Sequence, residues 1–117
     1  MRLALYGGSF DPPHVGHLMA MAYVLGTARA DGLLMVPCFR HRFDKRLTPF
    51  ADRMEMARLT AAALGDRVEV SDVEARLGGE SRTLTTVRAL LAERPGARVV
   101  VVHGADLLDE RERWYGW

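Results

Sequence analysis

Four short apolar runs alternate with three stretches of helical periodicity, and this alternation constrains the fold more than any other feature. The apolar runs cover residues 3–6, 33–36, 68–70 and 99–102. Between them, apolar residues recur at steps of three and four, as in an amphipathic helix. Such alternation predicts an α/β fold in which right-handed crossovers join parallel strands. The three helical stretches carry Leu18, Met21, Leu25 and Ala28, then Phe50, Met54, Ala57, Ala61 and Leu64, and then Leu84, Val87 and Leu91.

Capping and turn-forming residues predict where two of these helices begin or end. Thr48 and Pro49 predict the start of the second helix, with Thr48 as the N-cap and Pro49 at the first helical position. Gly65 predicts the end of that helix, and Pro95 with Gly96 predicts the end of the third.

The apolar runs differ in pattern, and the difference predicts the strand order. Residues 33–36 and the run from Val99 to Val102 are apolar throughout, as expected where helices cover both faces of a parallel sheet. Residues 68–71 alternate between apolar and polar, so we expect that strand near an edge. The pattern predicts a Rossmann-like, doubly wound parallel sheet of order 3-2-1-4 with flanking helices. Because the order reverses beside the first strand, a ligand is expected in the crevice above strands 1 and 4.

The segment from Gly7 to His17 combines several features of a phosphate site. Gly7 and Gly8 let the backbone turn tightly and approach a ligand. A helix N-terminus offers unpaired N–H groups and a partial positive charge. His14 and His17 stand three residues apart at this helix mouth, where an ordinary turn has no need of imidazole. The segment therefore favours the binding of a nucleotide's phosphates. A structural zinc site is not favoured, because His41 and His103 are isolated in the sequence.

Length and composition limit the class of protein. The chain has 117 residues, a formal net charge of +1 and one cysteine, Cys38. This length predicts one domain over residues 1–117, and the charge gives no basic field for nucleic acid. A lone cysteine cannot form an internal disulfide and fits a reducing cytoplasm. No apolar run approaches the length of a membrane span. We expect a soluble, cytoplasmic domain that binds neither nucleic acid nor membrane.

The glycine segment also carries a resemblance to a known superfamily. Gly7-Gly8-Ser9-Phe10-Asp11-Pro12-Pro13-His14-Val15-Gly16-His17 resembles the Gly-Gly-Thr-Phe-Asp-Pro-x-His-x-Gly-His segment of the HxGH nucleotidyltransferases. Within that superfamily the chain is most similar to the nicotinate or nicotinamide mononucleotide adenylyltransferases. The likeness continues in the family's order through Val36-Pro37, Glu74-Ala75-Arg76-Leu77-Gly78, Ser81-Arg82-Thr83 with Thr86, Gly104-Ala105-Asp106-Leu107-Leu108, and Trp114-Tyr115.

This resemblance implies an activity and a set of site residues. The implied reaction is adenylyl transfer from ATP to a pyridine mononucleotide with release of pyrophosphate, in NAD biosynthesis. It implies that His14 and His17 are catalytic and contact the ATP phosphates, and that Mg²⁺ sits on those phosphates with few protein ligands. The implied ATP site comprises Gly7, Gly8, Ser9, Phe10, His14, Gly16, His17, Gly104 and Asp106; the implied mononucleotide site comprises Arg82, Thr83, Asp106, Trp114 and Tyr115.

Several of these assignments have plain structural alternatives. Asp106 is equally well explained as a helix cap, and Trp114 as a core or interface residue. The family usually has tyrosine where Arg82 stands, and a guanidinium there favours a carboxylate, hence nicotinate over nicotinamide. Five basic residues lie between Cys38 and Leu47. The Pro-Pro-His-Lys that the family often has there, with basic residues that serve the phosphates, is missing. Lys45 or Arg42 is a candidate substitute, but charged residues are mostly exposed, which favours solvated surface.

The resemblance breaks near the end of the chain. Members of the family continue into a fifth strand and a last helix with Ile-Ser-Ser-Thr-x-x-Arg, whereas this sequence ends at Trp117. We therefore expect a truncated domain without that strand and helix, as either a natural short form or a fragment. The run from Val99 to Val102 would then be an open edge, which predicts a homo-oligomer that covers it. Two other functions stay open: a nucleotide-binding module without catalysis, and a phosphopantetheine adenylyl- or cytidylyltransferase-like enzyme.

Overall fold

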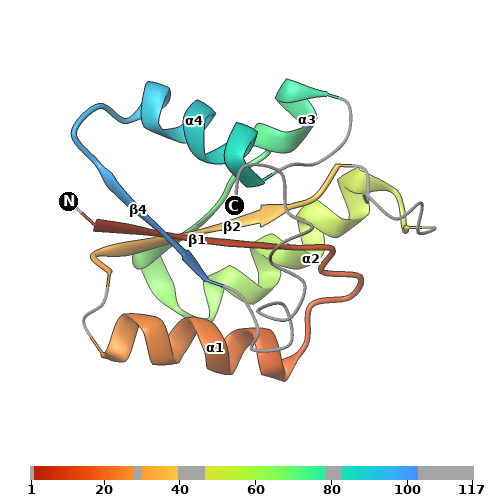
Figure 1. The fold of residues 1–117 in the computed structure, drawn as a ribbon. Helices are drawn as coiled ribbons and strands as arrows, with labels where there is room; N and C mark the ends of the chain where they lie inside the picture. The colour runs from red at the N-terminus through yellow and green to blue at the C-terminus, as the bar shows by residue number, and fades with distance from the viewer. Residues whose placement is uncertain (1, 28–29, 40–46, 79–82, 103–117) are drawn as a thin grey trace, which may run out of the picture.

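The computed structural model describes residues 2–27, 30–39, 47–78 and 83–102. In these residues, four strands alternate with helices along the chain, as Figure 1 shows. The elements are β1 (Arg2–Gly8), α1 (Val15–Gly26), β2 (Gly32–Pro37), α2 (Phe50–Ala62), the short 3-10 helix η1 (Gly65–Arg67), β3 (Val68–Val70), α3 (Val73–Leu77), α4 (Thr83–Glu93) and β4 (Arg98–Val102).

The strands form one parallel sheet of order β3-β2-β1-β4, which confirms the predicted order. In the register, Leu5 of β1 lies beside Leu34 of β2 and Val101 of β4. Helices α1 and α2 cover one face of the sheet, and α3 and α4 cover the other (Figure 1). This is the doubly wound arrangement expected from the alternation of strands and helices. It brings the carboxyl ends of β1 and β4 together, where Tyr6 pairs with Val102.

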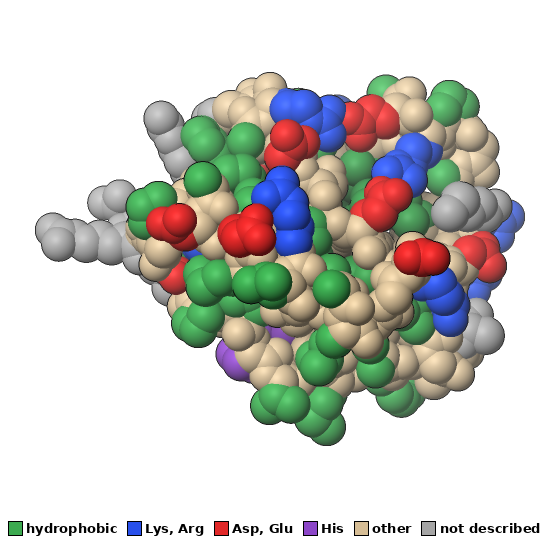
Figure 2. Space-filling model, turned by 180° about the vertical axis from the view of Figure 1, so that it is seen from behind, with side chains coloured by type: hydrophobic (Ala, Val, Ile, Leu, Met, Phe, Trp, Pro, Cys, Tyr) green, Lys and Arg blue, Asp and Glu red, His purple; other side chains and the backbone are tan. Residues whose placement is uncertain are grey.

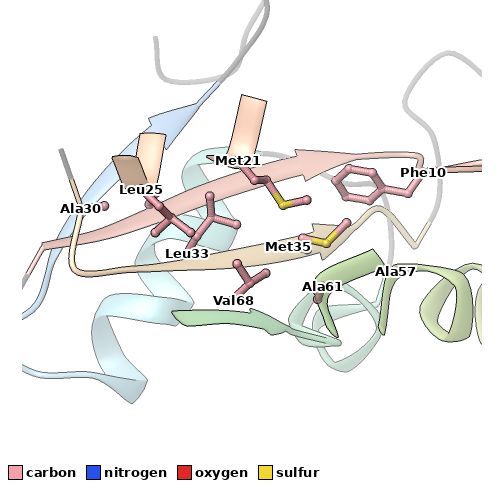
Figure 3. Packing of buried hydrophobic residues seen from close by; sticks show 10 residues of the cluster. Phe10, Met21, Leu25, Ala30, Leu33, Met35, Ala57, Ala61 and Val68 are labelled. Carbon is pink, nitrogen blue, oxygen red and sulfur yellow. The ribbon is translucent and has the colours of Figure 1, made fainter. Parts of the chain in front are cut away.

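The larger part of the core lies between the sheet and the helices α1 and α2. Figure 3 shows Met21 and Leu25 of α1 over Leu33 and Met35 of β2, with Ala57 and Ala61 of α2 beside them. Met21 and Met35 have no exposed surface. Burial of an apolar side chain of this size contributes about 1.5–3 kcal/mol. The ring of Phe10, just beyond β1, closes the same cluster at the carboxyl end of the sheet (Figure 3).

The opposite face of the sheet has a smaller apolar cluster. Leu3 and Leu5 of β1 pack there with Leu34 and Val36 of β2. Val73 from α3 and Leu90 from α4 cover them. Every residue of β2 is buried, as the unbroken apolar run predicted. β4 is only partly buried, and Val100 is 39% exposed, because β4 lies at the end of the described sheet rather than in its interior.

Two local predictions were wrong, and one helix was missed. Helix α2 begins at Phe50 with Pro49 as its N-cap, and no side chain caps it, so the predicted start with Thr48 as cap is one residue early. In α4, Leu90 is buried and Leu91 is 40% exposed, so Leu91 does not belong to the apolar face. Helix α3 was not predicted, because five residues are too few to show a helical period.

Candidate functional site

The site predicted from the glycine segment lies where β1 ends and α1 begins. β1 runs to Gly8, the chain crosses residues 9–13, and α1 starts at Val15 with His14 as its N-cap. Pro12 and Pro13 precede the helix, and the peptide bond between Asp11 and Pro12 is cis. The loop thus lies at the carboxyl edge of the sheet, next to the end of β4 and at the switch in strand order.

The two histidines cap helix α1 reciprocally. The backbone N–H of Gly16 donates to Nδ1 of His14 at 3.0 Å, and the backbone N–H of His14 donates to Nδ1 of His17 at 3.0 Å. This is the geometry of a capping box, built from imidazoles in place of the usual hydroxyl and carboxylate side chains. A ring nitrogen that accepts a hydrogen bond carries no proton, so each neutral ring has its proton on Nε2. The cap leaves both Nε2–H donors unused.

The rings of His14 and His17 also stack on each other. Their centroids are 3.9 Å apart with an interplanar angle of 29°, a stacked pair. His17 meets the ring of Phe10 edge-on at 5.0 Å and lies 6.0 Å from Tyr6. Burial, and secondly the neighbouring His14, lower the pKa of His17 below 6.5. His17 is therefore a neutral donor at neutral pH, positioned by two aromatic rings.

Gly16 is needed because the His14 ring lies over it. A Cβ at position 16 would stand 2.8 Å from Cε1 and 3.0 Å from Nδ1 of His14, closer than Cβ contacts normally are. Any side chain there would push the imidazole off the cap. The glycine between the two histidines thus has a steric reason within this chain.

The sharp turn after β1 falls on Phe10 rather than on the glycines. Phe10 has φ of 48°, whereas Gly7 and Gly8 belong to β1 and are not among the residues with positive φ. A bulky residue in this conformation costs about 1–2 kcal/mol. The ring is 2% exposed, so its burial offsets that cost. The interpretation that the glycines make the turn was wrong, because both lie in β1 and the positive φ falls on Phe10.

The remaining predicted site residues are only partly within the described chain. Thr83 is the first residue of α4, and its side chain lies outside the described part. Arg82, Gly104, Asp106, Trp114 and Tyr115 also lie outside it, as does most of the basic segment between Cys38 and Leu47. Their roles therefore stay predictions. Among Gly7, Gly8, Ser9, Phe10, His14, Gly16 and His17, the structure brings all seven together at one end of the sheet.

One residue next to the glycine loop was missed by sequence reasoning. Arg53 of α2 is 1% exposed and donates hydrogen bonds to the carbonyl oxygens of Ser9, Cys38 and Thr48. A charged residue in a helix is usually solvated, so its residue type gave no reason to single it out. Its position one turn before Ala57, on the apolar face of α2, was the available signal.

Neither a metal cluster nor a membrane span is found in the described residues. In residues 2–27, 30–39, 47–78 and 83–102, no group of three or more His, Cys, Asp or Glu residues is placed to hold a metal ion. Within the same ranges no helix is both long enough and apolar enough to cross a membrane.

A comparison with models of protein families shows which family the chain belongs to. A model of the cytidylyltransferase-like family matches residues 5–117. The chain belongs to the cytidylyltransferase-like family. The glycine loop, the capped α1 and the sheet switch point that carry the site all lie within the part that matches this family.

Within this family the chain is similar to curated nicotinate-nucleotide adenylyltransferases, which confirms the resemblance seen in the sequence. It is 47% identical over 118 residues to a probable nicotinate-nucleotide adenylyltransferase of Anaeromyxobacter dehalogenans (strain 2CP-C), covering 98% of this chain and 63% of the relative. With a probable nicotinate-nucleotide adenylyltransferase of Myxococcus xanthus the identity is 37% over 114 residues, covering 97% and 60%. The chain therefore spans a little under two thirds of the length of these relatives.

Solved structures share the fold. Plasmodium falciparum nicotinic acid mononucleotide adenylyltransferase complexed with NaAD superposes with a TM-score of 0.84 at 24% identity, covering 98% of this chain and 57% of that one. The same enzyme complexed with APC gives a TM-score of 0.84 at 20% identity, covering 98% and 56%. At these identities the likeness establishes a shared architecture.

Proposed function

We propose that this chain transfers the adenylyl group of ATP to nicotinate mononucleotide, releases pyrophosphate, and so serves NAD biosynthesis. Nicotinamide mononucleotide is the alternative acceptor within the same proposal. The curated relatives named as probable nicotinate-nucleotide adenylyltransferases support the substrate class. The cytidylyltransferase-like family match supports the type of reaction.

One observation carries the proposal: at the N-terminus of α1, two imidazole Nε2–H groups have no hydrogen-bond acceptor among the residues that the structure describes. Both Nδ1 atoms accept backbone N–H groups, so the rings are fixed in one tautomer and both free nitrogens are donors. A helix N-terminus adds its own N–H groups and partial positive charge. Donors without an acceptor at the switch point of a parallel sheet suit an anionic ligand, and a triphosphate is the anion that this reaction requires.

The reaction needs positioning and charge stabilisation rather than a protein nucleophile. A phosphate oxygen of the mononucleotide forms a bond to the α-phosphorus of ATP. The bond from that phosphorus to the oxygen bridging to the β-phosphate breaks, and pyrophosphate leaves in line. His14 and His17 would hold the phosphates and stabilise the charge that develops on them. Orientation of two bound reactants can supply about 7–11 kcal/mol of the barrier.

The other predicted contacts complete this proposal. The backbone from Gly7 to Phe10 and the residue Gly16 would border the ATP phosphates, together with Gly104 and Asp106. The pyridine mononucleotide would contact Arg82, Thr83, Asp106, Trp114 and Tyr115. The described residues offer nitrogen donors rather than a cluster of oxygen ligands. The proposed Mg²⁺ would therefore be held by the phosphate oxygens of ATP, with few protein ligands.

Pyrophosphate release in the presence of different acceptors tests the function. The chain is incubated with ATP and Mg²⁺ together with nicotinate mononucleotide, nicotinamide mononucleotide, phosphopantetheine, or no acceptor, and ATP binding is measured separately by calorimetry. We expect release with a pyridine mononucleotide and none without an acceptor. Pyrophosphate release with phosphopantetheine but with neither pyridine mononucleotide would overturn the proposed substrate class. ATP binding without release in any mixture would favour a binding module without catalysis.

Assembly and location form a smaller part of the proposal. We propose a homo-oligomer that covers β4, because β4 stands at the end of the described sheet and Val100 is 39% exposed. A single domain over residues 1–117 in the cytoplasm fits the composition and the lone Cys38. Light scattering that finds a monodisperse monomer at high concentration would contradict the oligomer.

A further inference from the structure

A buried arginine lies directly behind the glycine loop. Arg53 is on α2, one turn before Ala57, and is 1% exposed. Ala57 packs in the core beside Phe10 at the carboxyl end of the sheet (Figure 3). Burial of a guanidinium is costly unless its donors find acceptors. The contacts of Arg53 therefore indicate what the surrounding chain holds in place.

The guanidinium joins three separate segments through main-chain oxygens. Its Nε donates to the carbonyl of Thr48 at 2.7 Å, and one terminal nitrogen donates to the carbonyls of Cys38 at 2.7 Å and Ser9 at 3.2 Å. Its carbon lies 5.4 Å from the centre of the Phe50 ring, a cation–π contact. None of the ion pairs between described residues includes Arg53. Its charge is therefore offset by carbonyl dipoles in this part of the chain.

The same segments are also joined without Arg53. The backbone N–H of Cys38 donates to the carbonyl of Gly8 at 2.9 Å, which extends the pairing of β1 and β2 by one step. The backbone N–H of Thr48 donates to Oδ2 of Asp11 at 2.8 Å. Arg53 thus lies where β1 and β2 separate, at Ser9 and Cys38, and we call this place the fork. On its other side is the segment that enters α2.

We propose that Arg53 is a positioning residue for the glycine loop. By fixing the carbonyls of Ser9 and Cys38, it sets the path of residues 9–11 and thereby the orientation of their N–H groups toward the phosphate site. This inference rests on the proposed function for the identity of the ligand. The fixing of the loop itself does not depend on that function.

The planar guanidinium suits this role better than any other cation. Its donors point in fixed, divergent directions, so one group reaches Thr48 on one side and Ser9 with Cys38 on the other. A lysine keeps the charge but has a single nitrogen at the end of a flexible stem. It cannot hold all three carbonyls in this geometry.

Two variants and one control separate geometry from charge. Arg53→Lys keeps the cation, and Arg53→Met removes it while keeping an unbranched apolar stem. Arg58→Met is the matched control, because Arg58 lies on the same helix with its side chain 57% exposed and paired only with Glu55 among the described ion pairs. The thermal midpoint of each variant is recorded first, and all further measurements are made well below the lowest midpoint.

The first measurement uses Cys38 as an internal reporter of loop order. Cys38 is the only cysteine in the chain, and its Sγ lies 3.8 Å from the Ser9 hydroxyl. Its rate of reaction with an aromatic disulfide reagent reports how often this fork opens. We expect both Arg53 variants to react about tenfold faster than the wild type, a change equivalent to about 1.4 kcal/mol in the opening equilibrium. Arg58→Met should react at the wild-type rate.

The second measurement uses inorganic tripolyphosphate, with binding followed by calorimetry. We expect affinity to fall about tenfold in both Arg53→Lys and Arg53→Met, and to stay unchanged in Arg58→Met. A purely structural role would lower the thermal midpoint and leave affinity at low temperature intact. Arg53→Lys with either wild-type thiol reactivity or wild-type affinity for tripolyphosphate would overturn the proposal.

The two measurements distinguish the failure of this inference from the failure of the proposed function. If the wild type does not bind tripolyphosphate, the phosphate site fails, and the thiol rates still decide whether Arg53 fixes the loop. If the wild type binds and the thiol rates are equal in all proteins, the positioning role fails while the phosphate site stands.

Discussion

Two polar regions of the molecule, one beside the edge strand β3 and one at the mouth of α1, differ in whether their polar groups are already paired. Beyond β3 lies an open hollow of about 530 Å³, whose lining includes Arg76, Glu93 and Arg94. Beyond β1 lies the mouth of α1, with the histidine cap described above. The hollow is lined by charged side chains of both signs, whereas the helix mouth presents two imidazole N–H donors for which the described residues provide no acceptor.

The charges around the hollow neutralise one another. Arg76 pairs with Asp72 at 2.8 Å and also with Glu93, and Arg94 pairs with Glu69 at 2.9 Å. Hydrogen bonds to Glu93 and Asp72 raise the pKa of Arg76 above its ordinary value. Figure 2 shows positive and negative side chains interleaved over the face seen from behind, without a large patch of either sign. A hollow whose charges are already paired has little left for a ligand, whereas the cap of α1 presents two N–H donors that no described residue accepts.

Of the changes at the two regions, removal of the Phe10 ring should cause the largest loss in the free energy of unfolding. Phe10→Ala deletes a buried ring that also supports His17, and we expect a loss of about 3–5 kcal/mol in the free energy of unfolding. Urea denaturation measures it, with Leu59→Ala as control because Leu59 is 68% exposed. A loss no larger than that of the control would mean that the ring does not support the site.

Removing one imidazole donor should abolish most catalysis while leaving the fold intact. His17→Asn keeps an oxygen that accepts the His14 N–H in place of Nδ1, but it lacks the Nε2–H group. We expect kcat/KM for adenylyl transfer to fall about 100–1000-fold, the usual effect of losing one donor to a developing charge. Steady-state pyrophosphate release measures it, and retention of wild-type kcat/KM would place the chemistry elsewhere.

A side chain at Gly16 should separate affinity from stability. Gly16→Ala places a Cβ 2.8 Å from His14 Cε1, so the ring must leave the cap. Alanine favours a helix over glycine by about 1 kcal/mol. This gain offsets the stability lost with the cap, so we expect the free energy of unfolding to change little. We expect about a tenfold loss of tripolyphosphate affinity, because one donor is misplaced. Calorimetry with unchanged affinity would contradict the steric role of Gly16.

The pH dependence of stability should report on His17. Because burial and His14 lower the pKa of His17 in the folded chain, the unfolded chain binds its proton more readily. The contribution of neutral His17 to the free energy of unfolding is therefore fully present above pH 6.5. It should decline as the pH falls from that value through the lower pKa of the folded chain. Thermal unfolding at several pH values measures the decline, which His17→Asn should reduce. An equal decline in the wild type and in His17→Asn would mean that other titratable groups cause the pH dependence.

Breaking an ion pair at the hollow should give the smallest effect. Arg94→Met removes the partner of Glu69, and exposed pairs of this kind contribute about 0.2–1 kcal/mol. We expect a shift of that size in urea denaturation and no change in pyrophosphate release or tripolyphosphate binding. A large loss of either activity would reverse the comparison and make the hollow part of the site.

Much of the fold could be predicted because its signals are local. The four apolar runs and the long helical stretches each contain enough residues to show a period, and the parallel order followed from the difference between β2 and β3. Helix α3 has five residues and showed no period. The cap of α2 was misplaced by one residue: Pro49 is the N-cap, and the backbone N–H of Thr48 donates to Asp11, a contact 37 residues away in sequence that no local pattern shows.

The sequence alone determined the sheet, its switch point and the presence of two histidines at the mouth of α1, because spacing and residue type are enough for these. Only the tertiary structure decided which nitrogen of each ring is occupied, which residue takes the positive φ, and why Arg53 is buried. The physical reason is that these depend on satisfying polar groups and filling space between distant segments. Arg53 and Ser9 are 44 residues apart along the chain and meet only when β1, β2 and α2 pack together.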